Sequence, residues 1–165
     1  MMRNSRQDKN GGKNGAPLPA ALELLARRAL TARETQDKLR ERGFGAEETE
    51  ETLRRLSDWG YIDDDAYARR YCRLKRERRS LRRIRLEIRR RGVEDDLVAA
   101  ALAEEYPPEQ EQINCLRLLH QKGAPAALKT AAALSRQGYA ESHIRQALES
   151  FAREAAANPE PHWDN

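Results

Sequence analysis

The sequence predicts an all-α fold of three tandem three-helix repeats, and three regularly spaced glycines are the main observation behind this prediction. Gly43, Gly92 and Gly138 lie 49 and 46 residues apart, and each has a leucine or isoleucine four positions before it. A glycine just past a helix suits the left-handed C-terminal cap because it has no Cβ. A period in the forties indicates stacked helical units, each too small to bury its own apolar face.

The apolar pattern after each glycine repeats as well. The next residue is Phe44, Val93 or Tyr139, and apolar or threonine side chains follow at 6, 9, 10 and 13 positions after the glycine. This spacing places them on one face of a helix. The exception is Glu105, which occupies the last of these positions in the second repeat. It predicts that the helix there frays or is exposed at its end.

Nine helices and no β-strand are expected, and local signals mark where several helices begin. Thr31 followed by Glu34 forms a capping box. The acidic run at 63–65 favours a helix N-terminus through capping and the helix dipole. Pro107–Pro108 and Pro125 are placed for the first turns of two helices. The expected helices cover residues 18–29, 31–42 and 46–58, then 64–78, 80–91 and 94–105, and finally 108–121, 125–137 and 140–155.

The three repeats are expected to occupy residues 18–58, 59–106 and 107–155 of an elongated, modular protein. The segments at 1–17 and 156–165 are polar or interrupted by proline, and we expect them to be disordered tails. We see no signal peptide and no run of roughly 18 apolar residues that could span a membrane. The two cysteines lack metal-ligand spacing, which indicates reduced, buried thiols in a cytoplasmic protein.

Positive charge is concentrated in the second repeat. The chain has a formal net charge of +4, but residues 69–91 hold thirteen basic residues and only two acids, Glu77 and Glu87. Like charges at this density weaken folding, and the acids needed for pairing along the helix are nearly missing. We therefore interpret this segment as a surface for nucleic acid or another phosphate-rich partner. The alternative is a solvated face or one that binds an acidic protein.

The helix expected at 80–91 shows how these groups would be presented. Leu81, Ile84 and Ile88 recur at steps of three and four and form its apolar face. Leu86 lies on the basic side, either as a partner contact or as an ordinary exposed leucine. The arginines of the basic side are Arg82, Arg85 and Arg89 in one row and Arg83 and Arg90 in another. The full set of candidate binding residues is Arg69, Arg73, Lys75, Arg76, Arg79, Arg82, Arg83, Arg85, Arg89 and Arg90.

Several neighbouring residues have two possible roles. Tyr67, Tyr71 and Leu74 have the spacing of a buried helix stripe, which we favour over base stacking by the two tyrosines. Cys72 lies among arginines that would lower its pKa if it were exposed, but a small core residue is the preferred interpretation. The acidic run at 63–65 could bind a cation, but helix capping is favoured because no further ligand is placed to complete a shell.

Neither an enzyme nor a cofactor or metal is expected. His120, His143 and His162 are scattered, and no Ser/Asp or Cys/His arrangement accompanies them. The sequence also lacks a glycine-rich loop of the kind that cradles phosphates.

Three motifs resemble the RecX family of bacterial recombination regulators. The segment 61–71 is similar to the family's hallmark Gly-(Tyr/Leu)-(Ile/Leu)-(Asp/Asn)-Asp stretch, 39–44 to its Leu-x-x-Arg-Gly-Phe form, and 83–93 to its Arg-Ile-x-x-Glu form. The resemblance spans residues 18–152. Ser80 stands where the family commonly has glycine, but serine is a good N-cap, so the helix start is retained.

This resemblance implies a non-enzymatic modulator of the RecA recombinase that regulates DNA repair, recombination and the SOS response. A member of the family would lie in the groove of the RecA–single-stranded-DNA filament and lower its ATPase, strand-exchange and coprotease activities. The implied partners are the RecA nucleoprotein filament and single-stranded DNA, with non-specific double-stranded DNA as a further one. The protein would be a monomer that does not bind membranes.

Two other classes of function remain alternatives. A helix–glycine–helix unit can pass for a helix-turn-helix, so the protein could be a regulator that binds DNA directly. The helix expected at 94–105 is acidic, however, and cannot enter a DNA groove, which favours binding without sequence preference. The third class is a scaffold whose arginine-rich helix docks on an acidic protein.

Overall fold

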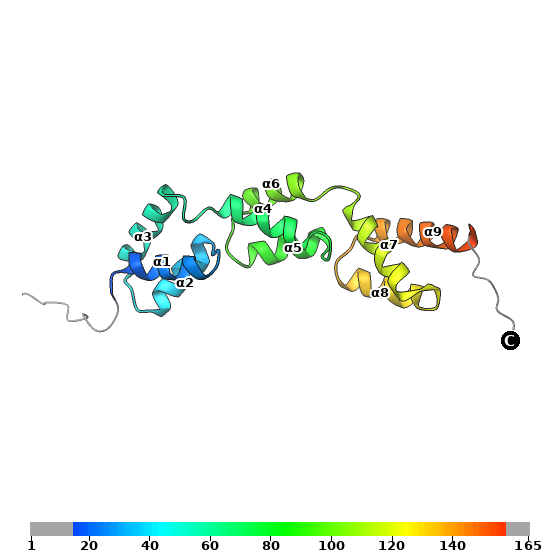
Figure 1. Ribbon diagram of the computed structural model, residues 1–165, viewed down its shortest axis with the longest axis horizontal. Coiled ribbons are helices and arrows are strands. Elements are labelled where there is room, and N and C mark those ends of the chain that lie inside the picture. The colour runs from blue at the N-terminus through cyan, green and yellow to red at the C-terminus, as the bar shows by residue number, and fades with distance from the viewer. Residues whose placement is uncertain (1–14, 158–165) are drawn as a thin grey trace, which may run out of the picture. The chain divides into compact units, whose positions relative to one another are not determined.

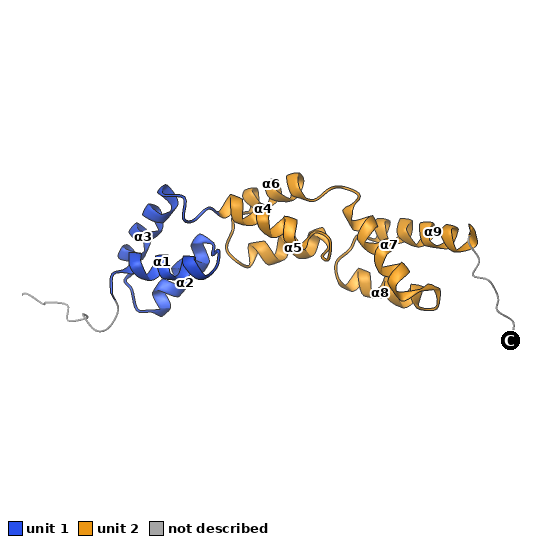
Figure 2. Ribbon diagram, viewed as in Figure 1, with its two compact units in different colours: residues 1–63 blue, residues 64–165 orange. Residues whose placement is uncertain are grey.

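The computed structural model describes residues 15–157, and within this range it confirms the all-α prediction. The described residues form nine α-helices and one 3-10 helix and contain no β-strand (Figure 1). The chain divides into two compact units, residues 1–63 and 64–165 (Figure 2). Most of the two predicted tails, residues 1–14 and 158–165, lies outside the described residues.

The first unit is a three-helix layer whose second helix starts as predicted. Glu34 N–H donates to Thr31 Oγ1 at 3.1 Å, and Thr31 N–H donates to Glu34 Oε2 at 3.3 Å, which confirms the capping box. The core of this layer is centred on Leu39, Leu56 and Ile62. Its helices are α1 (Pro17–Arg27), α2 (Ala32–Glu41) and α3 (Ala46–Asp58).

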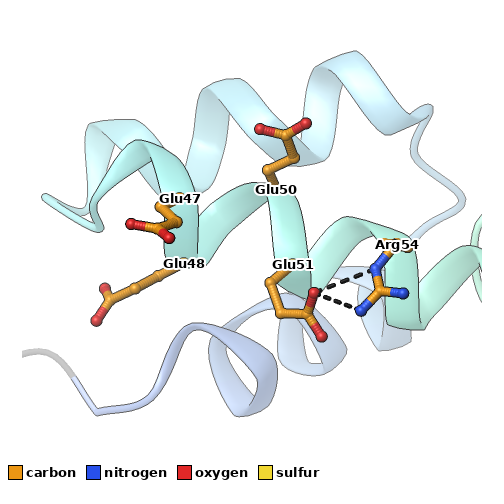
Figure 3. Close-up of a pocket in the computed structure, with 5 residues that line it drawn as sticks. All are labelled: Glu47, Glu48, Glu50, Glu51 and Arg54. Atoms are coloured by element: carbon orange, nitrogen blue, oxygen red, sulfur yellow. Dashed lines mark hydrogen bonds and ion pairs between the residues drawn. The ribbon is translucent and has the colours of Figure 1, made fainter.

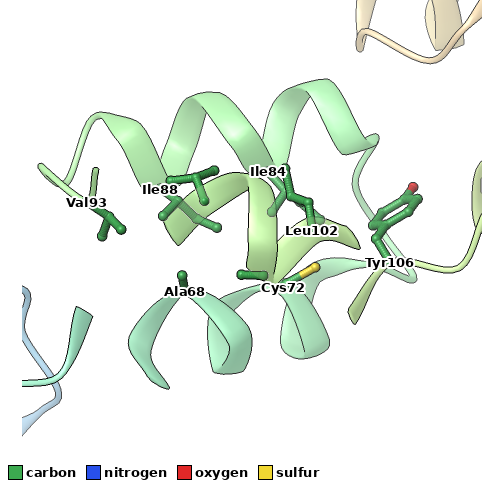
Figure 4. Packing of buried hydrophobic residues seen from close by; sticks show 9 residues of the cluster. Ala68, Cys72, Ile84, Ile88, Val93, Leu102 and Tyr106 are labelled. Atoms are coloured by element: carbon green, nitrogen blue, oxygen red, sulfur yellow. The ribbon is translucent and has the colours of Figure 1, made fainter. Parts of the chain in front are cut away.

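The second unit contains two further groups of three α-helices, each with its own buried cluster. The cluster of the first group includes Cys72, Ile84 and Ile88 (Figure 4), and that of the second includes Leu119 and Leu134. The first group consists of α4 (Asp64–Lys75), α5 (Leu81–Arg89) and α6 (Asp95–Glu105). The second consists of α7 (Gln110–Lys122), the 3-10 helix η1 (Ala124–Ala126), α8 (Ala127–Arg136) and α9 (Glu141–Ala157).

The three glycines that suggested the repeat cap helices as predicted. Gly43, Gly92 and Gly138 have φ values of 87°, 85° and 87°, which only glycine adopts without strain. At the first of them, Phe44 N–H donates to the carbonyl of Leu39 at 3.2 Å, the bond that defines the Schellman motif.

Two predicted helix starts are wrong because proline makes a tighter turn at each. Helix α7 begins at Gln110 rather than at Pro108, since the carbonyl of Pro107 accepts the Gln110 N–H at 3.0 Å in a separate turn. Pro125 lies in the 3-10 helix, where Ala126 N–H donates to Gly123 O at 3.2 Å, and α8 starts only after it. In both places proline precedes the α-helix instead of occupying its first turn.

Candidate nucleic-acid interface

Helix α5 presents its arginines as the sequence predicts. Ile84 and Ile88 are fully buried and Leu81 is half-buried, so this side of the helix faces the core (Figure 4). Leu86 lies on the opposite side and is 40% exposed. The exposed arginines of this helix are Arg82, Arg83, Arg85 and Arg89.

Two of these arginines nevertheless have carboxylate partners. Arg83 Nε donates to Glu87 Oε1 at 2.7 Å along the same helix. Arg89 Nε lies 2.6 Å from Oδ1 of Asp95, the first residue of α6. The predicted row of three equivalent arginines on α5 is therefore broken at Arg89.

Two arginines of α4, Arg69 and Arg73, are paired as well, mainly by acids of α6. Arg69 Nε donates to Asp65 Oδ2 at 2.7 Å and also pairs with Glu104. Arg73 pairs with Glu105, the last residue of α6. The sequence analysis considered only acids within 69–91 that could pair along a helix, so it did not anticipate the carboxylates that α6 and the start of α4 supply.

Arg76 helps to close the end of α6. Its Nη1 donates to the main-chain carbonyl of Glu105 at 3.0 Å. Because the Glu105 side chain is also paired with Arg73 and is only 13% exposed, the prediction that this helix end frays or is exposed is wrong. Arg73 and Arg76 therefore bind both the side chain and the main chain of the acid at this position of the repeat.

Five exposed basic residues between positions 75 and 85 have no ion-pair partner among the described residues. We call them the open basic segment. Arg90 from the predicted set shares these properties, as does Arg70. Sequence reasoning missed Arg70 and Arg78, although both lie in the run of charge that it identified. The open basic segment consists of Lys75, Arg78, Arg79, Arg82 and Arg85.

The main chain of the open basic segment is fixed by residues that lie far away in the sequence. Asn114 Nδ2 on α7 donates to the carbonyl of Arg76 at 2.7 Å. The Tyr106 hydroxyl donates to the carbonyl of Arg79 at 3.0 Å. Helix α4 ends at Lys75, three residues earlier than predicted. The turn that follows has a defined path because these carbonyls are hydrogen-bonded. Its basic side chains therefore extend from a fixed backbone.

Ser80 ends this turn and starts α5, as its N-cap prediction requires. Its Oγ accepts the Arg83 N–H at 3.2 Å and donates to the carbonyl of Gln137 at 2.8 Å. A Cβ at Gly138 would lie only 3.2 Å from Ser80 Oγ, so glycine there serves close approach as well as capping. The same hydroxyl therefore starts α5 and joins it to the end of α8.

Glu111 is the structural residue of this region that sequence reasoning missed. Its buried carboxylate accepts the N–H of Leu81 at 2.8 Å and that of Ala140 at 3.1 Å, and it lies 3.0 Å from His143 Nδ1. It thereby serves the first turns of both α5 and α9. No local signal could have identified it, because its partners are about thirty residues away in each direction.

The structure favours the core role of the two tyrosines over base stacking. Tyr67 and Tyr71 are stacked at 6.2 Å, and the guanidinium of Arg91 lies 6.0 and 5.3 Å from their ring centroids. The Tyr71 hydroxyl donates to Glu87 at 2.9 Å. Both rings also pack against the α4–α6 core. Because Arg91 lies over the rings, it already occupies the place that a base would take.

Of the two remaining predictions for α4, one is wrong and one is confirmed. Leu74 is 67% exposed, so its assignment to the buried stripe is wrong, because the core side of α4 runs through Ala68 and Cys72. Cys72 is fully buried, which confirms its core role. Burial raises the pKa of its thiol to about 11, with Glu105 adding to the rise and nearby arginines opposing it.

Neither a metal-ligand cluster nor a membrane-spanning helix is found in the part of the chain that the structure describes. No group of three or more His, Cys, Asp or Glu side chains there could hold a metal ion. Within the same residues, every helix is too short or too polar to cross a membrane.

Comparison with known proteins identifies the family. Two family models match this chain: the first three-helix domain of RecX matches residues 20–56, and the second three-helix domain of RecX matches residues 63–102. The regulatory protein RecX of Trichlorobacter lovleyi is 34% identical over 141 residues, which cover 79% of this chain and 92% of that protein. This chain belongs to the RecX family. The second RecX domain contains the whole open basic segment.

Other RecX proteins agree with this assignment. A RecX protein of Thermus thermophilus is 33% identical over 119 residues, 66% of this chain and 83% of that protein. RecX of Caldanaerobacter subterraneus is 35% identical over 92 residues, which span only 47% of its length. The crystal structure of RecX from Lactobacillus salivarius superposes with a TM-score of 0.73, covering 83% of this chain and 95% of that one. At 21% identity, this last similarity supports the fold.

Proposed function

We propose that this RecX-family chain regulates the RecA recombinase by binding the RecA–single-stranded-DNA filament. Binding would lower the ATPase, strand-exchange and SOS coprotease activities of the filament, and so regulate DNA repair and recombination. The observation that carries the proposal is the open basic segment, because its cations are exposed and have no ion-pair partner among the described residues. The protein would act in the cytoplasm as a monomer and without catalysis of its own.

The proposed contact uses only part of the basic set predicted from the sequence. Lys75, Arg79, Arg82, Arg85 and Arg90 would meet phosphates, together with Arg78 and Arg70. Arginine can bind a phosphate through two parallel hydrogen bonds, which fixes the orientation as well as the charge. The paired arginines, by contrast, would have to leave a carboxylate or carbonyl before they could bind a phosphate. We assign them to the fold: Arg69, Arg73, Arg76, Arg83 and Arg89.

Contact of this kind would not depend on DNA sequence. Phosphate contacts position a protein on nucleic acid, whereas base edges specify the sequence. The helix that would have to read bases in a helix-turn-helix arrangement is α6, but it begins with Asp95 and Asp96 and ends with Glu104 and Glu105. Its acids also pair with arginines of α4 and α5. These features favour a filament modulator over a sequence-specific regulator.

The direct test is the ATPase activity of RecA on single-stranded DNA while this protein is added. We expect substoichiometric amounts to lower the ATPase rate, and we expect the protein alone to show neither ATPase nor nuclease activity. An unchanged RecA rate at saturating protein would contradict the proposal. A preference of roughly a hundredfold for one duplex sequence would support the helix-turn-helix alternative instead.

A further inference from the structure

Two aromatic side chains at the end of α3 are exposed next to each other. Trp59 is 52% exposed and Tyr61 is 58% exposed. Their ring centroids are 6.5 Å apart in an edge-to-face arrangement, and the guanidinium carbon of Arg55 lies 4.9 Å from the centroid of the Trp59 ring. Single exposed apolar residues are ordinary, but two neighbouring rings with an arginine against one of them form a patch.

The backbone holds this patch in place. Gly60 lies between the two rings with a φ of 74°, and its N–H donates to the carbonyl of Ser57 at 2.9 Å. Tyr61 N–H donates to the carbonyl of Leu56 at 2.8 Å, which completes a Schellman cap. Because the main chain is already ordered on both sides of the glycine, a partner that binds the rings has little backbone freedom to remove.

Tyr61 departs from the pattern of the other capped helices in this chain. The residue after a capping glycine commonly packs back on the helix that it closes. Phe44 packs against the core of its layer, and Val93 and Tyr139 are each only 4% exposed. After Gly60 the buried residue is Ile62, one position later. The Tyr61 ring therefore does not pack in the core, whereas the side chains of Phe44, Val93 and Tyr139 do.

The charge of α3 indicates what kind of partner the patch fits. Four glutamates and Arg54 line a hollow on this helix (Figure 3), and Arg54 is held by Glu51 at 2.6 Å. Asp58, directly before the patch, is a further exposed acid. Over the whole of α3, five exposed acids outnumber two exposed arginines, so this helix would repel phosphates and attract basic side chains. The glutamates of the hollow are Glu47, Glu48, Glu50 and Glu51.

We propose that Arg55, Trp59 and Tyr61 form a docking patch for a protein surface that has an apolar hollow rimmed by basic side chains. Tryptophan, tyrosine and arginine are the residues most enriched among those that dominate binding energy at protein interfaces. This inference rests on the proposed function, since the protein surface in question is that of RecA within the filament. The two units then have different tasks: the first binds protein, and the open basic segment of the second binds DNA.

The test compares two probes with one variant. The probes are a RecA filament assembled on an oligo(dT) strand and the same strand without RecA. For Trp59→Ala/Tyr61→Ala we expect affinity for the filament to fall at least roughly tenfold, because two central aromatic side chains are lost. Affinity for the bare strand should stay within about twofold, because the patch does not contact phosphates.

Two further variants keep the test independent of folding. Trp59→Phe/Tyr61→Phe retains both rings and should bind the filament with most of the original affinity. Leu128→Ala removes another apolar side chain that is 82% exposed, and it should change neither affinity. Circular dichroism and thermal unfolding of each variant show whether the α1–α3 layer is intact.

Each outcome decides the proposal. An equal loss of affinity for the bare strand would mean that the rings stack on bases, which overturns it. Unchanged binding of both probes by the alanine variant would overturn this inference alone and leave the proposed function standing. Failure of the unaltered protein to bind the filament would instead remove the proposed function, and the docking patch for RecA with it.

Discussion

Two kinds of arginine lie within a few turns of each other in the α4–α6 layer. Arg69 and Arg73 on α4 face carboxylates at the end of α6. Arg79 and Arg82, in the open basic segment, have no ion-pair partner among the residues that the structure describes. The four count equally in a tally of charge. Net charge therefore locates a basic region, whereas pairing determines which of its groups are available to a polyanion.

The two kinds also differ in what holds them. The paired arginines join α4 to α6, although ion pairs at a surface are worth only about 0–1 kcal/mol each. The open segment is held instead through its main-chain carbonyls, by Asn114 and Tyr106, and through the Ser80 hydroxyl, which donates to the carbonyl of Gln137. Its side chains are therefore left for a partner without loss of the fold.

The sharpest test of this comparison is a pair of triple variants. Arg79→Gln/Arg82→Gln/Arg85→Gln should weaken binding of single-stranded DNA roughly 100-fold, because three phosphate contacts are lost. Unfolding by urea should be nearly unchanged, since these side chains have no ion-pair partners among the described residues. Fluorescence anisotropy of a labelled oligonucleotide measures the affinity.

The matched control removes the same charge from the paired set. Arg69→Gln/Arg73→Gln/Arg89→Gln should lower the free energy of unfolding more and the DNA affinity less. Salt dependence adds a second criterion: with the seven proposed contacts to a single strand, the slope of log K against log salt should be about −4.9, and about −2.8 after the first triple change. Equal losses of affinity in the two variants would erase the distinction between open and paired arginines.

The next largest effect is expected at Glu111, which supports the start of α5. Glu111→Ala removes the acceptor for the N–H groups of Leu81 and Ala140, and we expect a loss of about 2 kcal/mol in the free energy of unfolding. Affinity for DNA should fall as well, because the open basic segment loses part of its support. Urea unfolding followed by circular dichroism measures the first effect.

Glu154→Ala is the control for this change. Glu154 also pairs with a histidine, His120 at 2.9 Å, but both side chains are about half exposed. Removing it should cost no more than about 0.5 kcal/mol. If both alanine variants lose the same free energy of unfolding, the two hydrogen bonds that Glu111 accepts from main-chain N–H groups are unimportant to the fold.

The fold of this chain could largely be predicted because its signals are local. The caps at Gly43, Gly92 and Gly138 need only a left-handed residue after a helix, and each helix shows its apolar stripe within two turns. The starts of α7 and α8 were misplaced because proline is acceptable both in a first helical turn and in the turn before it. In this chain a separate turn closed by a hydrogen bond to the carbonyl of Pro107, and a 3-10 helix closed by one to the carbonyl of Gly123, precede the two helices.

The candidate site was predicted less well, because its details depend on residues distant in sequence. Arg73 and Glu105 are 32 positions apart, and Asn114 reaches a carbonyl 38 positions away. A charge count over 69–91 cannot include either contact. Leu74 was misplaced for a related reason: its spacing from Tyr71 fits a helix face, but the core side of α4 runs through Ala68 and Cys72 instead.

A smaller effect should distinguish Glu87 from Glu77, the two acids within residues 69–91. Partial burial would raise the pKa of Glu87, but hydrogen bonds from Arg83 and Tyr71 and nearby arginine charge hold it below its ordinary value of 4.5. A lowered pKa gives stability that is present above pH 4.5 and is lost as the pH falls through the folded-state value. Glu87→Gln should therefore be less stable than the unaltered protein at pH 7, by less than about 1 kcal/mol, and equal to it at strongly acid pH.

Glu77→Gln provides the comparison for this pH series. Glu77 is exposed and its side chain has no hydrogen bond or ion pair among the described residues, so its replacement should change the stability little. Thermal unfolding between about pH 3 and 7 measures both profiles. A stability difference at Glu87 that persists unchanged at the acid end would show that packing, and not its charge, is responsible.

The smallest effect is expected at the thiols, which report whether the seam between α4 and α6 stays closed. Burial raises the pKa of Cys72 to about 11 and that of Cys115 to about 12, so at about pH 8 both are protonated and inaccessible in the folded protein. Neither should react measurably with a disulfide reagent until denaturant is added. Arg73→Gln removes the ion pair with Glu105 that joins α4 to α6, so it should speed labelling of Cys72 several-fold and leave Cys115 unchanged. Equal acceleration at both thiols would mean that the whole second unit opens together, and the arginine pairs would then have no separate role in holding α6 on α4.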